Sequence, residues 1–243
     1  MKAGLANTYD LKVPRYTSYP TAPHFDEAVD GARYGAWLGG IDPGTPLSLY
    51  FHIPFCAEMC WFCGCHTKIV KRYDPVAAYV ETLLAEIDLV AAALPGRFAA
   101  RHLHWGGGSP SMLTGADWRS IMDKLAARFD IAPGARVAVE IDPRTATEDY
   151  VKTLAGAGVN RASIGVQDFD ADVQAAINRV QPFAVTERVV GWLRAHGIAN
   201  LNMDLMYGLP HQTVPGVRRM ADQAASLEPD RLALFGYAHV PWM

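Results

Sequence analysis

Four cysteines are the residues whose spacing most clearly indicates chemistry. They are the only cysteines among 243 residues, and they lie within ten positions, at Cys56, Cys60, Cys63 and Cys65. We expect a cytosolic protein, in which thiols stay reduced, so such a group favours a metal or redox site over a disulfide framework. Three thiolates from one short loop can hold three irons of a 4Fe-4S cluster and leave the fourth iron open to a substrate or cofactor.

The spacing of the cysteines, C-x3-C-x2-C-x-C, argues against two other kinds of metal site. A structural zinc site usually draws on two separated pairs of ligands, and the sequence has no second pair. A plant-type ferredoxin would add a distant fourth cysteine, which is also missing from the sequence. In the cluster interpretation, Cys65 could fill the fourth position, but it follows Cys63 by only two residues, and both sulfurs would have to bend back onto one small cluster. Zinc binding and plain reduced thiols are the alternatives.

A triple glycine is the second candidate feature. Gly106, Gly107 and Gly108 precede Ser109 in the stretch HWGGGSP. Without side chains, these residues could let a ligand touch backbone N–H and C=O groups directly. The stretch is not a P-loop, because no Gly-Lys-Ser/Thr follows it. A tight turn between a strand and a helix is the alternative.

Single polar residues at the ends of apolar runs form the third feature. Glu140, Gln167 and Asp204 each stand where packing alone would favour an aliphatic residue. One such residue could be a turn or a helix cap, but three of them beside a cysteine loop predict a common pocket. Arg179 could pair with a carboxylate there, although an exposed helical arginine is the more common case.

The histidines and tryptophans near these motifs are assigned no chemical role. His52 alternates with apolar neighbours, as expected of a buried imidazole, and His102 and His104 are interpreted in the same way. Three tryptophans are interpreted as packing residues: Trp105, Trp118 and Trp192.

A repeating β/α pattern must position these residues. Six apolar runs predict buried strands: LSLYFHI ending at residue 53, then 101–105, 136–141, 161–166, 200–207 and 231–237. Helical patterns lie between them, for example from Asp74 as an N-cap, from Thr114, from 147 to 158 and from 186 to 197. Right-handed crossovers would form a parallel sheet, either a six-unit partial barrel or an open doubly wound sheet. In both, the chemistry should lie at the carboxyl ends of the strands.

Composition and domain organisation further narrow the class of protein. Half of the residues are apolar, 19% are charged and the net charge is −3, which is typical of a globular protein and gives no footprint for nucleic-acid binding. No stretch reaches 18 apolar residues, so we predict a cytoplasmic protein without membrane spans. Residues 1–45 are interpreted as an irregular leader that packs on the barrel, and residues 46–243 as the catalytic domain.

Several stretches together resemble the radical S-adenosylmethionine (SAM) superfamily and, within it, the oxygen-independent coproporphyrinogen III oxidases. They are PRYTSYPTAPHF, YFHIPFCAEMCWFCGCHT, LHWGGGSPSML, VEIDPR, ASIGVQDFD, INRVQP, NMDLMYGLP and GYAHVPWM, which cover nearly the whole chain from Pro14 onward. Cys65 and the RYTSYPTA leader distinguish this branch from relatives that insert or carry haem. Two positions depart from the common pattern: Ser109 stands where Thr is frequent, and Trp61 where Tyr is frequent.

The resemblance implies a partial (β/α)6 barrel, a 4Fe-4S cluster on Cys56, Cys60 and Cys63, and one or two molecules of S-adenosylmethionine. The positions that match the family's cofactor-binding residues are Tyr50, Phe62, Gly107, Gly108, Ser109, Glu140, Gln167, Arg179, Asp204 and Ala238. Family members continue into a helical C-terminal domain that helps to enclose the substrate, and we expect that domain to be absent from this chain.

The implied activity is an oxidoreductase of haem biosynthesis, a coproporphyrinogen dehydrogenase. It would convert coproporphyrinogen III to protoporphyrinogen IX by 5′-deoxyadenosyl radical chemistry, without oxygen. Its partners would be that substrate and an unidentified electron donor, with no nucleic acid and no membrane, and the family suggests a monomer. No residue is assigned as an acid or base catalyst, and Glu140, Gln167 and Asp204 are predicted to position the reactants. The alternative is a haem-binding or haem-delivery protein on the same scaffold.

Overall fold

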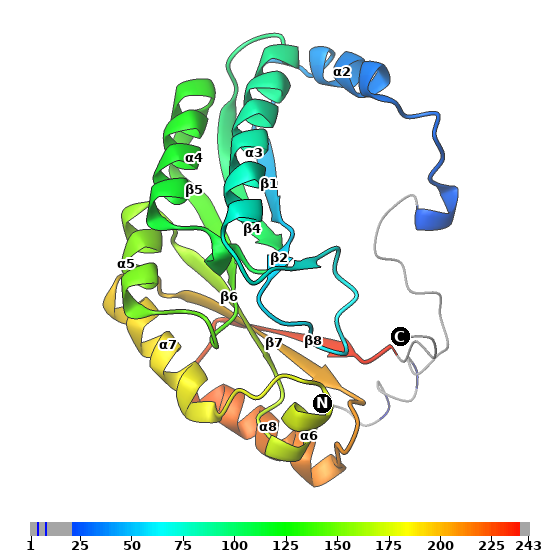
Figure 1. The fold of residues 1–243 in the computed structure, drawn as a ribbon, viewed down its shortest axis with the longest axis vertical. Coiled ribbons are helices and arrows are strands. Elements are labelled where there is room, and N and C mark those ends of the chain that lie inside the picture. The colour runs from blue at the N-terminus through cyan, green and yellow to red at the C-terminus, as the bar shows by residue number, and fades with distance from the viewer. Residues whose placement is uncertain (1–3, 5–7, 9–20, 239–243) are drawn as a thin grey trace.

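A curved sheet of six parallel strands forms the centre of the computed structural model, which describes residues 4, 8 and 21–238 (Figure 1). The sheet order follows the chain: β1 (Leu47–Ile53), β4 (Ala99–Gly107), β5 (Asp130–Ile141), β6 (Arg161–Gln167), β7 (Asn200–Tyr207) and β8 (Arg231–Gly236). A doubly wound sheet would reverse direction at a switch point. Because this order never reverses, the sheet is a partial barrel, and the predicted (β/α)6 class is confirmed.

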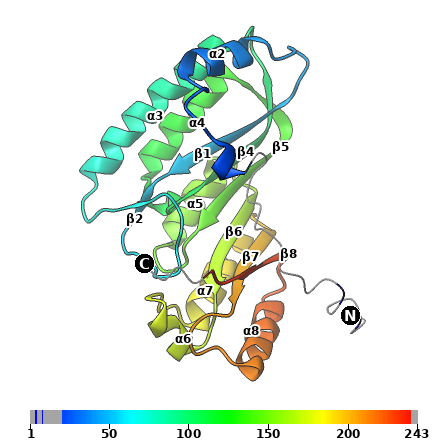
Figure 2. The same cartoon turned by 90° about the vertical axis from the view of Figure 1, so that its right-hand side faces the viewer.

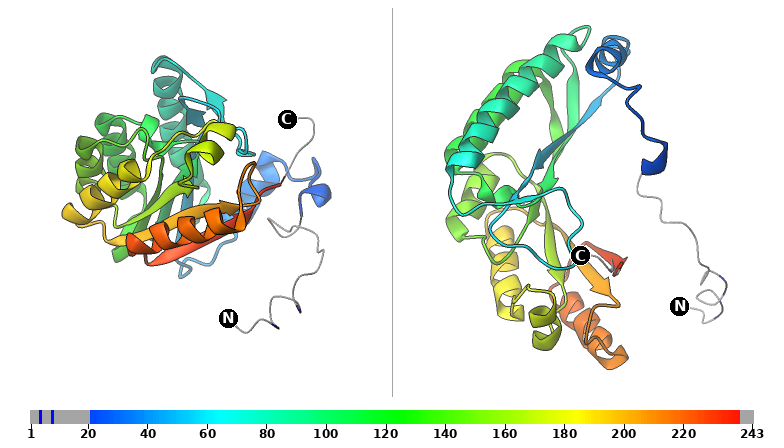
Figure 3. Two further views of the ribbon diagram at one scale, coloured as in Figure 1. Left: turned by 90° about the horizontal axis from the view of Figure 1, so that it is seen from below. Right: turned by 45° about the vertical axis from the view of Figure 1, so that its right-hand side comes forward.

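Helices cover the convex side of this sheet (Figure 3). They are α3 (Asp74–Ala93), α4 (Gly115–Arg128), α5 (Glu148–Gly156), α7 (Phe183–Ala195) and α8 (Val214–Ser226), and the short α6 (Ala171–Ala176) follows β6. Two short strands, β2 (Phe55–Cys56) and β3 (Lys68–Ile69), pair separately, and η2 (Pro110–Met112) follows β4. No helix among the described residues is long and apolar enough to span a membrane.

Two helix starts differ from the prediction. Thr114 caps α4 as expected, and it forms a capping box with Asp117. Asp74, however, is the first residue of α3 and not its N-cap, because Tyr73 occupies the cap position and Pro75 the first turn. Helix α7 starts at Phe183, after Pro182 and earlier than residue 186, since proline directly before a helix supplies a suitable φ angle.

Strand β5 is also longer than predicted. It begins at Asp130, well before Pro133 and Gly134, which in the sequence resemble a turn. The pairing register with β4 jumps from Ile131 to Arg136, so the residues between them bulge out of the ladder without ending it.

The leader and the last strand show two further differences. Residues 21–45 are not wholly irregular, because they contain η1 (Ala22–His24) and α2 (Gly31–Gly39), which lies beside α3 (Figure 2). Most of the leader motif, residues 14–20, lies outside the described residues. Strand β8 was expected to be buried on both faces, yet Leu234 is 58% exposed, because β8 pairs with β7 alone among the described strands.

The core fills the space between the sheet and its helices. Trp105 of β4 and Trp118 of α4 are fully buried, and their ring centroids lie 5.0 Å apart, which confirms their predicted packing role. Trp192 is only partly buried, but it also packs against the core. This layer fixes the strands, and therefore the positions of their carboxyl ends.

Two leucines of α3 test the importance of this layer for stability. Leu83 is 6% exposed and Leu89 is 71% exposed. We predict that Leu83→Ala lowers the free energy of unfolding by about 2–5 kcal/mol, because it leaves a cavity in the core. The matched substitution Leu89→Ala should change it by less than about 0.5 kcal/mol. Urea denaturation of both variants measures the difference, and equal losses would contradict this packing.

Candidate active site

A cavity of about 430 Å³ lies at the carboxyl ends of the strands. Most of the predicted site residues line it: Cys56, Cys60, Phe62, Cys63, Gly107, Gly108, Glu140, Gln167, Arg179 and Asp204, together with Cys65. Parallel strands end at one edge of a sheet, so residues far apart in the sequence meet there. The predicted convergence of the cysteine loop, the triple glycine and the strand-end polar residues is therefore observed.

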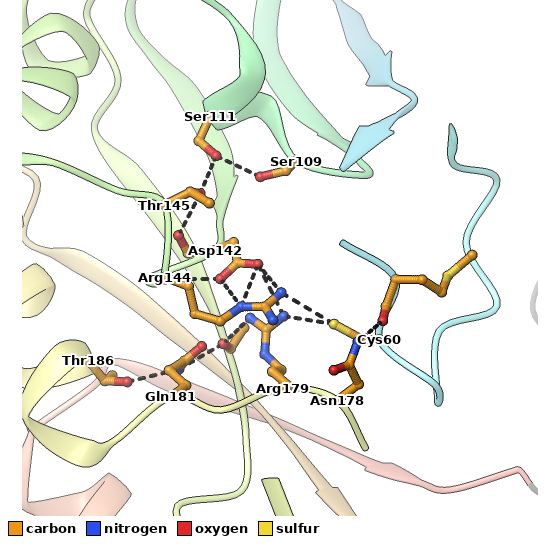
Figure 4. Close-up of polar contacts among 12 residues, drawn as sticks. Cys60, Ser109, Ser111, Asp142, Arg144, Thr145, Asn178, Arg179, Gln181 and Thr186 are labelled. Atoms are coloured by element: carbon orange, nitrogen blue, oxygen red, sulfur yellow. Dashed lines mark hydrogen bonds and ion pairs between the residues drawn. The ribbon is translucent and has the colours of Figure 1, made fainter. Parts of the chain in front are cut away.

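Three of the predicted residues do not line this cavity. Tyr50 is 58% exposed, and its ring stacks on His104, which does line the cavity, with centroids 5.7 Å apart. The buried Ser109 hydroxyl bonds to Ser111 at 2.7 Å, as Figure 4 shows. Ala238 is exposed near the end of the described chain. Their roles in cofactor binding stay predictions.

The cysteine loop is anchored at both ends and in the middle. Cys56 ends β2, and the pairing of β2 with β3 closes the loop (cyan in Figure 1). The backbone N–H of Trp61 donates to the carbonyl of Ile177 at 3.0 Å. Asn178 Nδ2 donates to the carbonyl of Met59 at 2.8 Å. These bonds hold the loop against the segment that connects α6 to α7.

The thiols of this loop differ in acidity. Burial, together with Cys63 and Cys60, raises the pKa of Cys56 to about 11. A hydrogen bond with Cys65 lowers the pKa of Cys63 to about 6, and the same contact raises the pKa of Cys65 well above its ordinary value. Within this pair, the shared hydrogen bond thus favours the thiolate on Cys63 over the thiolate on Cys65.

The triple glycine leaves space for side chains and backbone of the protein itself, whereas the sequence suggested space for a ligand. A Cβ at Gly106 would lie 2.7 Å from Glu140 Oε1, and one at Gly107 would lie 2.7 Å from the His52 ring. At Gly108 the Cβ would lie 2.6 Å from the carbonyl oxygen of Phe55 in β2. The missing side chains therefore let the Glu140 carboxylate, an imidazole and β2 approach β4 closely. Gly107 and Gly108 nevertheless also line the cavity.

Two of the carboxylates that line the cavity come from strands of the sheet, Glu140 from β5 and Asp204 from β7. Glu140 accepts hydrogen bonds from the Gly107 backbone N–H at 3.2 Å and from His104 Nε2 at 3.3 Å. Asp204 accepts from Ser163 Oγ at 3.0 Å and from Asn202 Nδ2 at 2.8 Å. Burial, and more weakly the charge of Glu140, raises the pKa of Asp204 despite these bonds.

Buried charges surround Cys60. Arg179 is 6% exposed and is not the exposed helical arginine considered as the alternative. Its Nη1 lies 3.3 Å from Asp142 Oδ2 and 3.5 Å from Cys60 Sγ (Figure 4). Arg144 Nη2 lies 2.6 Å from the same carboxylate and 3.3 Å from the same sulfur. Burial opposes ionisation of Asp142, but the hydrogen bonds and charges of the two arginines outweigh it and lower its pKa.

Sequence reasoning missed several of these residues. Asn202 lies two positions before Asp204 on its strand, and therefore on the same face, so the period of two could have indicated it. Asp142 and Arg144 follow Glu140 in the VEIDPR stretch, which carries part of the family resemblance, but the sequence indicates a role only for Glu140. The histidines were wrongly expected to be buried: His52 and His104 are half-buried, and His102 is exposed.

Comparison with known proteins identifies the family. Residues 50–224 match the radical SAM superfamily. The chain belongs to this superfamily. Its cavity lies at the carboxyl ends of the strands, where parallel α/β barrels place their active sites.

Individual proteins of this superfamily are similar to the chain over nearly its whole length. A protein of Bradyrhizobium diazoefficiens named oxygen-independent coproporphyrinogen III oxidase is 51% identical over 242 residues, covering 99% of this chain and 54% of the relative. The protein of that name from Paracoccus denitrificans is 48% identical, covering 97% and 52%. The solved coproporphyrinogen III oxidase of Escherichia coli, a radical SAM enzyme, matches with a TM-score of 0.88 and 37% identity, covering 93% and 52%. The chain spans about half the length of these relatives.

Gly108 gives a direct test of the close approach of β2 to β4. We predict that Gly108→Ala lowers the free energy of unfolding by about 1–3 kcal/mol, because the new methyl group would overlap the Phe55 backbone. Gly156→Ala is the control, since a Cβ there would meet nothing within 4 Å, and it should leave stability unchanged or slightly higher. Equal effects in urea denaturation would contradict this account of the glycines.

Proposed function

We propose that this chain acts in haem biosynthesis as an oxygen-independent coproporphyrinogen III oxidase. The reaction is the oxidative decarboxylation of coproporphyrinogen III to protoporphyrinogen IX. The observation that carries the proposal is the cavity itself. It joins the four thiols of one loop to carboxylates from two strands, in a radical SAM barrel whose named relatives are oxidases of this kind.

The thiol loop fits a 4Fe-4S cluster on Cys56, Cys60 and Cys63. All three line one cavity, two guanidinium groups stand beside Cys60, and soft thiolates are the ligands such clusters require. No three His, Cys, Asp or Glu side chains of the described part converge on a point that would hold a single ion. A cluster needs no such point, because each thiolate binds a different iron.

The polar residues of the cavity suit S-adenosylmethionine, of which one or two molecules would bind. The cluster and S-adenosylmethionine together supply the radical chemistry when they are bound. Glu140 and Asp204 present carboxylate oxygens that can accept hydrogen bonds from the amino and hydroxyl groups of this cofactor. Phe62 and Met206 add apolar surface that limits water. Glu140, Gln167 and Asp204 position reactants in this proposal, and none is required to act as an acid or base.

The substrate and the electron donor are further parts of the proposal. Coproporphyrinogen III is taken from the names of the relatives, and the donor is an unidentified protein or small reductant. The cytoplasmic location and the monomeric state stay predictions.

An anaerobic assay tests the proposed reaction. The chain is reconstituted with iron and sulfide, reduced, and given S-adenosylmethionine with or without coproporphyrinogen III. We expect formation of 5′-deoxyadenosine that the substrate stimulates, together with a product that carries vinyl groups. Tight binding of haem without any conversion of the porphyrinogen would contradict the oxidase and favour the haem-delivery alternative.

Serine substitutions separate the cysteine roles. We expect Cys60→Ser to lose the brown chromophore, most of its iron and all turnover, because serine is a poor ligand for the cluster. The matched variant is Cys65→Ser, from the same loop, which should keep its iron. Iron content and visible absorption measure both. Iron near the wild-type amount in Cys60→Ser would refute the assignment of this ligand.

A further inference from the structure

Cys60 differs from the other three cysteines in its charged surroundings. It is the buried member of the four. Two guanidinium nitrogens donate to its sulfur, Arg144 Nη2 at 3.3 Å and Arg179 Nη1 at 3.5 Å. Among the described residues, no arginine makes such a bond to Cys56, Cys63 or Cys65. The contact is therefore specific to one of the three expected ligands.

Asp142 holds both guanidinium groups in place. It accepts from Arg144 Nε at 3.0 Å and Nη2 at 2.6 Å, a two-pronged contact, and from Arg179 Nη1 at 3.3 Å. The side chains of Arg144, Asp142 and Arg179 are 19%, 16% and 7% exposed, so water screens these charges weakly. Two cations and one anion leave a net charge of about +1 directed at the Cys60 sulfur.

A second feature fixes Arg179 independently of Asp142. Arg179 Nη2 donates to the Gly165 carbonyl at 2.7 Å, and a Cβ at Gly165 would lie 3.0 Å from that nitrogen. The arginine thus lies against the end of β6, in a space that a side chain at position 165 would narrow. Asp142 holds both cations, and the Gly165 carbonyl adds a second anchor for Arg179.

We propose that Arg144 and Arg179, oriented by Asp142, are positioning residues that bind the Cys60 thiolate and raise the reduction potential of the cluster on this loop. The inference rests on the proposed function, because it requires a cluster there. Hydrogen bonds to the sulfurs and nearby charge set the potentials of such clusters. Positive charge stabilises the reduced form, which carries one more negative charge, and weak screening makes the effect larger.

Two substitutions that change the charge beside Cys60 in opposite directions test the inference. Potentiometric titrations followed by EPR, on the reconstituted full chain, compare Arg144→Met with Asp142→Asn. At a fixed solution potential, we expect Arg144→Met to lower the ratio of reduced to oxidised cluster about tenfold. This corresponds to a shift of the reduction potential by about 59 mV in the negative direction for one electron. Asp142→Asn removes the anion, so it should shift the potential in the positive direction.

Control variants separate charge from structural support. Arg144→Lys keeps the charge and should restore most of the wild-type potential. Arg101→Met removes an exposed arginine at the amino end of β4, far along the strand from the cavity, and should leave the potential unchanged. If both Arg144→Met and Asp142→Asn shift the potential the same way, the group is a structural brace and the inference is overturned.

The outcomes also distinguish this inference from the proposed function. Normal iron loading with equal potentials in wild type, Arg144→Met and Asp142→Asn would overturn the role of the arginines and leave the proposed oxidase intact. A wild-type chain that takes up no iron would contradict the proposed function, and the inference with it.

Discussion

Parallel pairing of six strands in chain order is the constraint on which the site depends. Residues as far apart as Cys56 and Asp204 line one cavity only because neighbouring strands end at the same edge. The core on the convex side, with Trp105 and Trp118 in contact, sets the position of that edge. The fold thus brings together groups that no local stretch of sequence could assemble.

Close backbone approach is the second requirement of the site. The triple glycine lets β2 and the Glu140 carboxylate come near β4, and Gly165 leaves space for Arg179. Two non-glycine residues nearby have left-handed backbone, Gln167 with φ of 69° and Asn178 with φ of 52°. Gln167 ends β6 at the cavity, and Asn178 fixes the cysteine loop through Met59. Unfavourable backbone of this kind is typical of functional sites, where surrounding contacts hold it in place.

Much of the architecture could be predicted from the sequence, because apolar runs and caps such as Thr114 are local signals. The Pro133–Gly134 stretch concealed the start of β5, since those residues usually end strands and here lie in a bulge. The strand-end rule also found Glu140, Gln167 and Asp204. It could not reveal that Asp142 orients two arginines toward Cys60. The contacts of Arg144 and Arg179 with Cys60 join residues that are 84 and 119 positions apart in the sequence. The tertiary packing of β5, the cysteine loop and the α6–α7 connection decides it.

The central claim is that three thiolates of one loop hold a cluster whose fourth iron is open to S-adenosylmethionine. Mössbauer spectroscopy of the chain, reconstituted with isotopically enriched iron, tests it most directly. The account predicts iron sites in a ratio of three to one, with the unique site alone shifted when S-adenosylmethionine is added. Four equivalent irons that do not respond to S-adenosylmethionine, or a chain that binds zinc and no cluster, would contradict it.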